Sequence, residues 1–290
     1  MMTSSREYVR KTMPMIGLGT YQIRNENYLR NVVDAALSCG CRLFDTAQLY
    51  GNEAALGRNL IEFLPKYNLT RSDIFIITKI APENQGTEAA RSSVKQSLSN
   101  LQLDYIDLML IHWPGTNIVP TADARSAELR KQTYTVLEEF HGLGVIRAIG
   151  VSNYEIRHLE MLLAHCKVPP ALNQIELHPH FHQLDLLEYC KARDIAIQAY
   201  SSLGGLRYHN RLFADEDVKE LAAKYAITVP QFLLSWGMSQ SICVLPCSTS
   251  RQRTIENFSA THVRIDNEDV QRLLNNGKRY KVNWDPVIID

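Results

Sequence analysis

Eight short apolar runs recur along the chain, and a stretch with helical periodicity follows each of them. Most runs are rich in Ile, Leu and Val, and they are bounded by Gly, Pro or polar residues. Continuous apolar strands that alternate with helices are typical of a parallel sheet that is buried on both faces. The expected strands are 13–20, 40–45, 74–79, 106–112, 148–152, 171–177, 195–201 and 242–246.

Between these runs, apolar residues recur at three- and four-residue spacing, which predicts helices. A loop rich in Gly, Tyr and Arg is expected directly after the strand 195–201. No linker divides the 290 residues, and 45% of them are hydrophobic, so there is material for one large core. Eight strand-helix units therefore predict a single α/β domain over residues 1–290, a (β/α)8 TIM barrel, which commonly needs about 250 residues. The expected helices are 25–37, 53–63, 87–101, 127–143, 155–166, 184–193, 215–225, 230–238, 252–258 and 268–276.

Four residues that suit acid-base chemistry lie at three successive strand ends. Asp45 ends one run and Tyr50 follows it on a short turn, while Lys79 and His112 close the next two runs. Because active sites of such barrels lie at the C-terminal ends of the strands, we expect these side chains to meet. The pKa of a free Tyr is about 10, so a nearby cation is needed to stabilise its phenolate. We expect Lys79 to supply that charge and an ion pair with Asp45 to reduce the cost of its burial.

Each member of this set also has a purely structural interpretation. Taken alone, Tyr50 would more often be a packing residue, and His112 would more often be a satisfied core histidine. Their combination with Lys79 favours chemistry instead. In that interpretation Tyr50 donates a proton to a carbonyl oxygen, and His112 orients the carbonyl or shares the proton relay.

The order of these residue types resembles the aldo-keto reductase superfamily. The resemblance extends from Gly17 to Trp284, nearly the whole chain. It implies reduction of aldehydes or ketones with a nicotinamide cofactor, and it gives Asp45, Tyr50, Lys79 and His112 the catalytic roles. Compact reductases of the prostaglandin F synthase and diketogluconate reductase type are the most similar subgroup. The matching segments are Asp45–Ala47, Tyr50–Glu53, Thr78–Lys79, His112–Pro114, Gly150–Tyr154, Asn173–Pro179 and Glu256–Phe258.

The cofactor cannot be assigned to a doubly wound domain, because no G-x-G-x-x-G motif occurs. The resemblance implies instead that the cofactor lies across the barrel mouth and binds before the substrate. It implies that Ser152, Asn153 and Gln174 hold the nicotinamide carboxamide and that Tyr200 stacks on the ring. The full cofactor set implied in this way is Thr20, Asp45, Ser152, Asn153, Gln174, Tyr200, Ser201, Leu203, Ser248, Arg253, Glu256 and Asn257.

The sequence departs from the family pattern where the adenosine end of the cofactor would bind. Cys247 stands at the position where the family usually has Lys, whereas Arg253 keeps the second expected cation. Ser202 likewise replaces the family's usual Pro in the loop that covers the pyrophosphate. We therefore expect NADPH as the cofactor, with a weakened preference over NADH.

The substrate pocket is expected to be lined by aromatic side chains. Tyr21, His112 and Trp113 are the candidate substrate-binding residues, and Trp284 is a further apolar wall candidate. The family often has an aromatic residue directly after the catalytic lysine, but Ile80 follows Lys79 here. One wall of the pocket is therefore not fixed by the resemblance.

Charge and cysteine content argue against several other classes of protein. There are 31 Lys and Arg against 31 Asp and Glu, so neither a nucleic acid nor a membrane surface is an expected partner. No apolar segment has the length of a signal region or a membrane span. The six cysteines form no C-x-x-C pair, which favours reduced core thiols in a cytoplasmic protein over disulfides. For a barrel reductase of this kind we expect a monomer.

Two alternatives to a reductase are considered. The potassium-channel β-subunits resemble this family and hold the cofactor while serving a channel, so a regulatory protein with little turnover is the first alternative. The intact proton relay argues against it. A metal-dependent hydrolase is the second, because His178, His180 and His182 lie close together in sequence. No metal site is expected, since Lys79 would repel a cation in the same pocket, and these histidines are expected on the surface or in loops.

Overall fold

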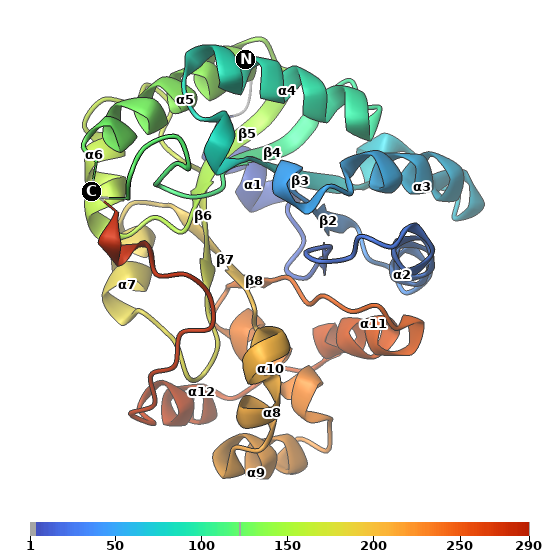
Figure 1. Cartoon of the computed structure of the whole chain (residues 1–290). Coiled ribbons are helices and arrows are strands. Elements are labelled where there is room, and N and C mark those ends of the chain that lie inside the picture. Colours follow the sequence, from blue (N-terminus) through green and yellow to red (C-terminus); the bar gives the residue numbers. More distant parts are fainter. Residues whose placement is uncertain (1–3, 122, 290) are drawn as a thin grey trace.

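Eight parallel strands, hydrogen-bonded to one another in chain order, form the centre of the molecule, and helices surround them (Figure 1). The computed structural model describes residues 4–121 and 123–289. Residues 1–3, 122 and 290, which complete the expected 1–290 domain, lie outside the described residues. The strands are Leu18–Gly19 (β1), Leu43–Asp45 (β2), Phe75–Ile80 (β3), Ile106–Ile111 (β4), Ile146–Ser152 (β5), Leu172–Glu176 (β6), Ala196–Tyr200 (β7) and Cys243–Val244 (β8).

The sheet closes on itself where the last strand meets the first. Ile16, just ahead of β1, forms a parallel bridge with Val244 of β8. The backbone N–H of Gly19 donates to the carbonyl oxygen of Pro246 at 3.0 Å. A Cβ atom at Gly19 would lie only 3.1 Å from the carbonyl oxygen of Leu245, so a glycine allows this close approach. The predicted fold class, a (β/α)8 barrel, is confirmed.

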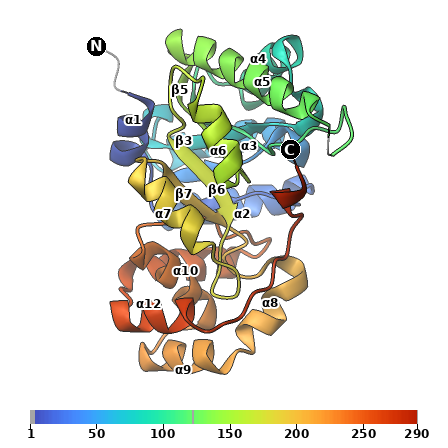
Figure 2. The ribbon, with the colours of Figure 1, turned by 90° about the vertical axis from the view of Figure 1, so that its left-hand side faces the viewer.

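The helices pack around the barrel and at its two ends. Figure 2 shows α1 at one end of the barrel and the segment that leads to the C-terminus at the opposite end. The α-helices are Ser5–Thr12 (α1), Glu26–Ser38 (α2), Glu53–Lys66 (α3), Thr87–Leu101 (α4), Arg125–Gly142 (α5), Ile156–Leu163 (α6), Leu184–Ala192 (α7), Gly205–Phe213 (α8), Glu216–Lys224 (α9), Val229–Ser239 (α10), Arg251–Phe258 (α11) and Asn267–Leu274 (α12). Short 3-10 helices are Gln48–Tyr50 (η1), Arg71–Asp73 (η2), Pro82–Asn84 (η3), Ser259–His262 (η4) and Pro286–Ile288 (η5).

The inside of the barrel is apolar near α1 and polar at the opposite end. Phe75 and Ile77 of β3 pack in one cluster with inward residues of the neighbouring strands and with Val9 of α1. Because side chains alternate across a strand, Lys79 lies on the same face of β3 as Phe75 and Ile77. By the same alternation, Asp45 lies on the inward face of β2 together with Leu43. The sequence thus positions its polar strand ends in one ring at the barrel mouth.

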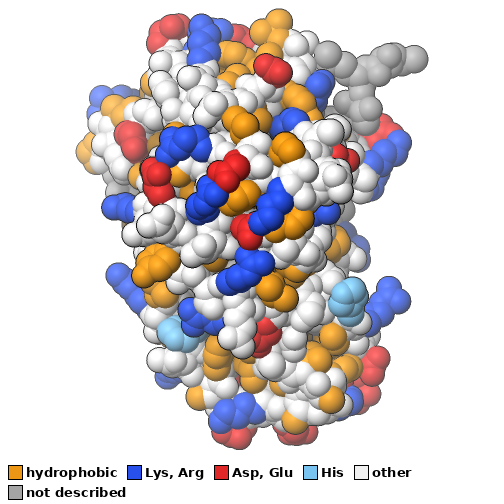
Figure 3. All heavy atoms as spheres, turned by 90° about the vertical axis from the view of Figure 1, so that its right-hand side faces the viewer, with side chains coloured by type: hydrophobic (Ala, Val, Ile, Leu, Met, Phe, Trp, Pro, Cys, Tyr) orange, Lys and Arg blue, Asp and Glu red, His pale blue; other side chains and the backbone are white. Residues whose placement is uncertain are grey.

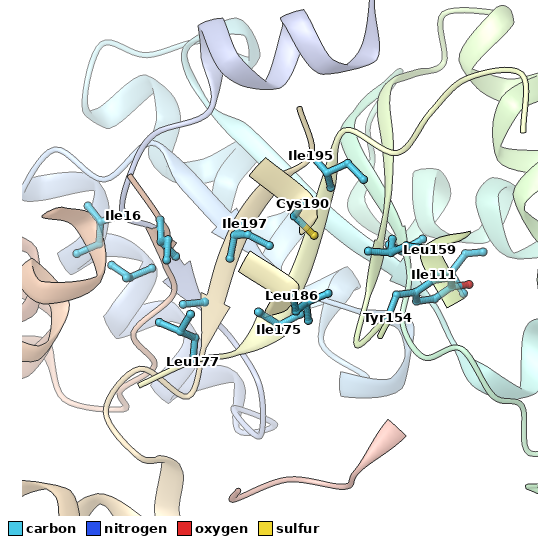
Figure 4. Packing of buried hydrophobic residues seen from close by; sticks show 14 of the residues in the cluster. Ile16, Ile111, Tyr154, Leu159, Ile175, Leu177, Leu186, Cys190, Ile195 and Ile197 are labelled. Carbon is cyan, nitrogen blue, oxygen red and sulfur yellow. The ribbon is translucent and has the colours of Figure 1, made fainter. Parts of the chain in front are cut away.

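The alternate residues of the same strands face the surrounding helices. Ile175 of β6 and Ile197 of β7 belong to the largest cluster of buried side chains. Figure 4 shows them beside Leu186 and Cys190 of α7, between the strands and the helix. This outer layer is apolar on both sides, as expected for a parallel barrel.

The surface carries both signs of charge. Figure 3 shows Lys and Arg side chains interspersed with Asp and Glu and with scattered apolar side chains on one face. Within residues 4–121 and 123–289, no helix combines the length and apolarity that crossing a membrane would need. All six cysteines are free: Cys41, Cys190 and Cys243 are buried, Cys39 and Cys166 are half-buried, and Cys247 is exposed.

Several predicted elements differ from the observed ones. The strands expected at 13–20 and 242–246 shorten to two residues each, β1 and β8. The loop expected after the seventh strand contains the helix α8, in which only Leu212 is buried. The helix α1 was not expected, and it buries only Ser5 and Val9. Both helices are short and bury at most two residues, so few apolar positions mark them in the sequence.

Candidate active site

The ammonium group of Lys79 lies at the centre of the predicted set. Its Nζ donates to both carboxylate oxygens of Asp45, at 2.7 and 2.8 Å, and to the carbonyl oxygen of Thr46 at 2.9 Å. It also lies 3.2 Å from the phenol oxygen of Tyr50. Lys79 is 0% exposed and Asp45 is 3% exposed. The expected ion pair between Lys79 and Asp45 is confirmed, and it brings the ammonium group against the phenol.

The turn that carries Tyr50 is held by a neighbouring asparagine. Tyr50 ends the 3-10 helix η1, and Gly51 follows in the left-handed region with φ 69°. The side-chain oxygen of Asn52 accepts from the Thr46 hydroxyl at 2.6 Å, and its nitrogen donates to the carbonyl oxygen of Thr20 at 2.9 Å. Because Asn52 is 3% exposed, these bonds fix the loop between β2 and α3. The sequence analysis did not identify Asn52 as a residue of the site.

His112 is the residue directly after β4, and its ring borders the phenol. The His112 and Tyr50 rings meet edge to face with their centroids 5.6 Å apart. Burial, reinforced by the charge of Lys79, lowers the pKa of His112 well below its ordinary value, so the imidazole is neutral. Its Nδ1 atom is buried without a hydrogen-bond partner among the described residues. The ring therefore keeps hydrogen-bonding capacity for another molecule.

The pKa of Tyr50 differs from the expectation. The sequence analysis expected Lys79 to lower it, but burial, followed by the Asp45 carboxylate, raises the pKa of Tyr50 well above its ordinary value. Burial also lowers the pKa of Lys79, an effect that the Asp45 carboxylate opposes. The physical reason is that burial disfavours the charged phenolate, and the nearby Asp45 carboxylate disfavours it further. In this structure Tyr50 is a protonated phenol.

The residues expected to hold the nicotinamide carboxamide form one hydrogen-bonded group. The hydroxyl of Ser152 donates to the carbonyl oxygen of Gln174 at 2.9 Å. The side-chain amide of Asn153 donates to Ser152 Oγ at 3.0 Å and accepts from the Tyr200 hydroxyl at 2.6 Å. Asn153 has φ 63°, a left-handed conformation that Asn tolerates better than most residues. The Gln174 amide also donates to Asp45 at 2.8 Å, which links this group to the ion pair.

Other predicted cofactor residues lie around the same opening. Thr20 is buried and its hydroxyl donates to the carbonyl oxygen of Asp45 at 2.9 Å. Ser201, directly after β7, has φ 52°, and its Oγ accepts from the side chain of Asn283 at 3.1 Å. Leu203 is half-buried and packs against the outer core.

The residues expected at the adenosine end lie on and before α11. Ser248 and Asn257 line a small cavity, whose other lining residues are Gly17, Leu18, Ala36, Pro246, Thr254 and Phe258. The exposed Arg253 lies on the first turns of α11, and Glu256 accepts a hydrogen bond from the Thr228 hydroxyl. Cys247 is exposed, and its thiol lies 3.3 Å from the carbonyl oxygen of Tyr21. Cys247 and Arg253 do not line this cavity, but both are adjacent in sequence to residues that do, Cys247 to Pro246 and Ser248, and Arg253 to Thr254.

A row of aromatic rings borders the phenol on both sides. The ring of Tyr21 lies 5.1 Å from that of Tyr50, and the ring of Trp113 stacks 6.4 Å from that of His112. The ring of Trp284 lies 4.9 Å from that of Trp113. Tyr21 and Trp284 are 51% and 44% exposed, so they form the open part of this wall. The three predicted wall aromatics, Tyr21, Trp113 and Trp284, therefore lie together.

His178, His180 and His182 lie in the loop between β6 and α7, one of the two places expected for them. His178 and His180 are nevertheless buried, so the surface alternative is wrong for these two. Their partners are carboxylates: His178 lies 3.3 Å from Glu176, and His180 lies 2.7 Å from Asp215. No group of three or more potential ligands that could hold a metal ion occurs among the described residues.

Gln198 is a further buried residue of the site that the sequence analysis missed. Its side-chain oxygen accepts from the Gln174 amide at 2.6 Å, and its nitrogen contacts the thiol of Cys243 at 3.1 Å. A glutamine in the middle of the apolar run 195–201 was the available signal. It lies in register with Gln174 of β6, on the face of the sheet that Lys79 also occupies.

Known proteins resemble this chain over nearly its whole length. A model of the aldo/keto reductase family matches residues 15–275. Glyoxal reductase of Bacillus subtilis is 35% identical over 278 residues, covering 95% of this chain and 94% of that protein. The 9,11-endoperoxide prostaglandin H2 reductase of Trypanosoma cruzi is 34% identical over 276 residues, covering 94% and 91%. The crystal structure of an aldo-keto reductase enzyme from a Medee basin deep-sea metagenome library has a TM-score of 0.87 at 34% identity, covering 96% of each chain.

Proposed function

Because this chain belongs to the aldo/keto reductase family, we propose that it reduces aldehydes or ketones with a nicotinamide cofactor and that Tyr50 is the proton donor. Family membership itself implies carbonyl reduction. The observation that supports the assignment of Tyr50 is the contact between its phenol oxygen and Lys79 Nζ, 3.2 Å, inside a buried ion pair. No other arrangement described above joins an acid, a cation and a partly open apolar wall.

Tyr50, Lys79 and Asp45 have different roles in one proton transfer. A bound nicotinamide would supply the hydride to the carbonyl carbon. The raised pKa of Tyr50, caused first by burial, keeps its proton in place until negative charge develops on the carbonyl oxygen. Lys79, 3.2 Å away, then stabilises the phenolate that remains, and Asp45 keeps the ammonium oriented.

His112 is proposed to orient the carbonyl. As a neutral imidazole with a ring nitrogen that has no partner among the described residues, it offers a hydrogen bond without a competing charge. The adjoining Trp113 ring limits where the substrate can lie. Proximity of this kind lowers the barrier by fixing the reacting groups in advance.

The residues at the mouth suit a dinucleotide. The hydroxyl and amide groups of Ser152, Asn153 and Gln174 are the donors and acceptors that a carboxamide requires, and Tyr200 provides an aromatic face. At the other end, Arg253 can grip a 2′-phosphate. We propose NADPH as the cofactor, with Ser201, Leu203, Ser248, Glu256 and Asn257 completing its site together with Thr20 and Asp45.

The proposed setting is that of a cytoplasmic single-domain monomer that acts on a small carbonyl compound. The support for a reducing compartment is the six free thiols. The mixed surface charge in Figure 3 favours neither a nucleic acid nor an anionic surface as a partner.

The decisive test is to assay Tyr50→Phe with a panel of aldehydes, ketones and sugars. The nicotinamide absorbance is followed with NADPH and, separately, with NADH. We expect the variant to lose about 10²- to 10⁴-fold in kcat, the usual contribution of general acid catalysis. Cofactor binding, measured by tryptophan fluorescence, should remain. Near wild-type turnover by the variant would exclude Tyr50 as the donor. Cofactor binding without turnover by the unmodified protein would instead favour a regulatory protein.

A further inference from the structure

The carboxylate of Glu176 lies buried at the mouth end of β6, and the proposed reaction does not use it. Its Oε1 accepts the backbone N–H of Val282 at 2.6 Å. Its Oε2 accepts the backbone N–H and the side-chain amide of Asn283, both at 2.9 Å. Glu176 is 2% exposed. A buried carboxylate that receives three N–H groups holds the donating segment firmly.

The segment that Glu176 holds leads directly to Trp284. The side chain of Asn283 also donates to Ser201 Oγ at 3.1 Å, so this segment is bound to the ends of both β6 and β7. On the other side of Trp284, the guanidinium of Arg157 on α6 donates to the carbonyl oxygens of Val287 and Ile289. Figure 2 shows the segment passing along the mouth end of the barrel towards α6. Trp284 thus lies between two backbone anchors.

The ring of Trp284 is partly exposed and packs on a second tryptophan. It is 44% exposed, and its ring contact is with Trp113 at 4.9 Å. Trp113 in turn stacks on His112, which borders Tyr50. Any displacement of the backbone at Asn283 would therefore move the outer aromatic wall of the reaction centre and leave the ion pair in place.

We propose that Glu176 is a positioning residue that sets selectivity for aromatic carbonyl substrates, because it holds the backbone that presses Trp284 against Trp113. This inference rests on the proposed carbonyl reduction. A bulky aromatic aldehyde would contact Trp284, whereas a small aldehyde beside Tyr50 and His112 would not reach it.

Glu176→Gln is the informative variant. The two backbone N–H groups bind different carboxylate oxygens, and a carboxamide has an NH2 group in place of one of them, so one backbone N–H would face a donor. With NADPH, we expect the KM for 2-naphthaldehyde to rise about 3- to 10-fold, the scale of a lost aromatic contact. The kcat, and the KM for propanal, should stay within about 2-fold. Trp284→Ala should change the ratio of the two KM values in the same way. The double variant Glu176→Gln/Trp284→Ala should have the same ratio as Trp284→Ala.

Asn283→Ala provides a second route if Glu176→Gln does not fold, because it removes the side-chain contacts to both Glu176 and Ser201. A structural readout accompanies the kinetics. The near-ultraviolet circular dichroism of the Trp113 and Trp284 pair should decrease in Glu176→Gln, in Asn283→Ala and in the reference variant Trp284→Phe.

Glu138→Gln is the control for the same substitution at another carboxylate that binds backbone. Glu138 accepts two successive backbone N–H groups, those of Lys167 and Val168, both on its Oε1 and at the start of the segment that leads into β6. It should change neither the KM ratio nor the dichroism. Equal KM ratios for wild type, Glu176→Gln and Trp284→Ala would overturn the inference. Failure of the wild type to reduce any carbonyl would instead overturn the proposed function, and the dichroism would still show whether Glu176 positions Trp284.

Discussion

At the scale of single residues, the site depends on how a buried ion pair acts on its neighbours. Lys79 is paired to Asp45 through both carboxylate oxygens, and this pairing compensates much of the cost of burying the ammonium. Burial, followed by the Asp45 carboxylate, raises the pKa of Tyr50, so the phenol keeps its proton. His112, kept neutral first by burial, borders the phenol.

The neutral state of His112 predicts acid sensitivity. Its pKa is lowered in the folded protein, so below about pH 6.5 the unfolded chain binds a proton that the folded protein does not. Stability should therefore be lost as the pH falls from about 6.5. Urea unfolding at pH 7.5 and 5.5 should show a smaller loss of stability in His112→Gln than in the wild type. The same substitution at the exposed His165 is the control, and an unchanged loss in His112→Gln would contradict the assignment.

A second prediction at this scale concerns the choice of cofactor. Arg253 is expected to contact the 2′-phosphate of NADPH without help from a second cation, since Cys247 carries no positive charge. Cys247→Lys should tighten NADPH binding about ten-fold and leave NADH nearly unchanged. Arg253→Ala should bring the two cofactors close to parity. Fluorescence titration measures both, and tighter binding of NADH than of NADPH by the unmodified protein would refute the assignment.

The catalytic candidates could be predicted because strand ends are visible in sequence. Asp45, Lys79 and His112 each close an apolar run, so the barrel rule places them at one mouth. Asn52 and Gln198 could not be assigned in the same way. Their roles depend on contacts with residues far along the chain, such as the bonds from Asn52 to Thr20 and from Gln174 to Gln198.

At the scale of elements, the end of the barrel opposite the site is closed by α1. Its Tyr8 hydroxyl donates to Asp107 Oδ1 at 2.6 Å, and the backbone N–H of Ile76 donates to Asp107 Oδ2 at 2.9 Å. Arg71 donates to the same carboxylate. One buried aspartate therefore ties α1, η2, β3 and β4 together.

Asp107→Ala should destabilise the fold without affecting the chemistry. Removing the buried carboxylate leaves Arg71 without its counter-ion and the Tyr8 hydroxyl without its acceptor, and we expect a loss of about 3 kcal/mol in the free energy of unfolding. Tyr8→Phe should cost about 1 kcal/mol. The control is Glu139→Ala, which breaks the exposed pair with Arg91 and should cost well under about 1 kcal/mol. Urea unfolding measures all three, and a reduced kcat/KM in Asp107→Ala would show that this end of the barrel influences the site.

The elements that the sequence predicted poorly share a physical cause. Strands β3 and β4 have six residues each and were recognised as long apolar runs. In contrast, β1 and β8 have two residues each, and their pairing is completed by Ile16, Gly17 and Gly19 at the seam. Their apolar runs continue past the paired residues, so hydrophobicity alone overestimates such short strands.

At the scale of the whole molecule, the first and last parts of the chain are held together. The seam joins β8 to the residues around β1, and the C-terminal segment contacts Glu176, Ser201 and Arg157. Neither half of the barrel can unfold without exposing the strand edge of the other half. The structure thus supports the proposal that residues 1–290 act as one domain.

One cooperative unfolding transition is the expected consequence. Trp236 lies in the core on α10, whereas Trp113 and Trp284 lie at the mouth, so the wild-type fluorescence reports on both regions. In Trp236→Phe it reports on the mouth alone. Urea transitions of far-ultraviolet circular dichroism and of fluorescence should coincide in both proteins. NADPH at 100 times its Kd should shift both signals together by about 2.7 kcal/mol, because it binds only the folded barrel. A mouth signal that melts before the dichroism would show instead that the segment carrying Trp284 opens separately from the barrel.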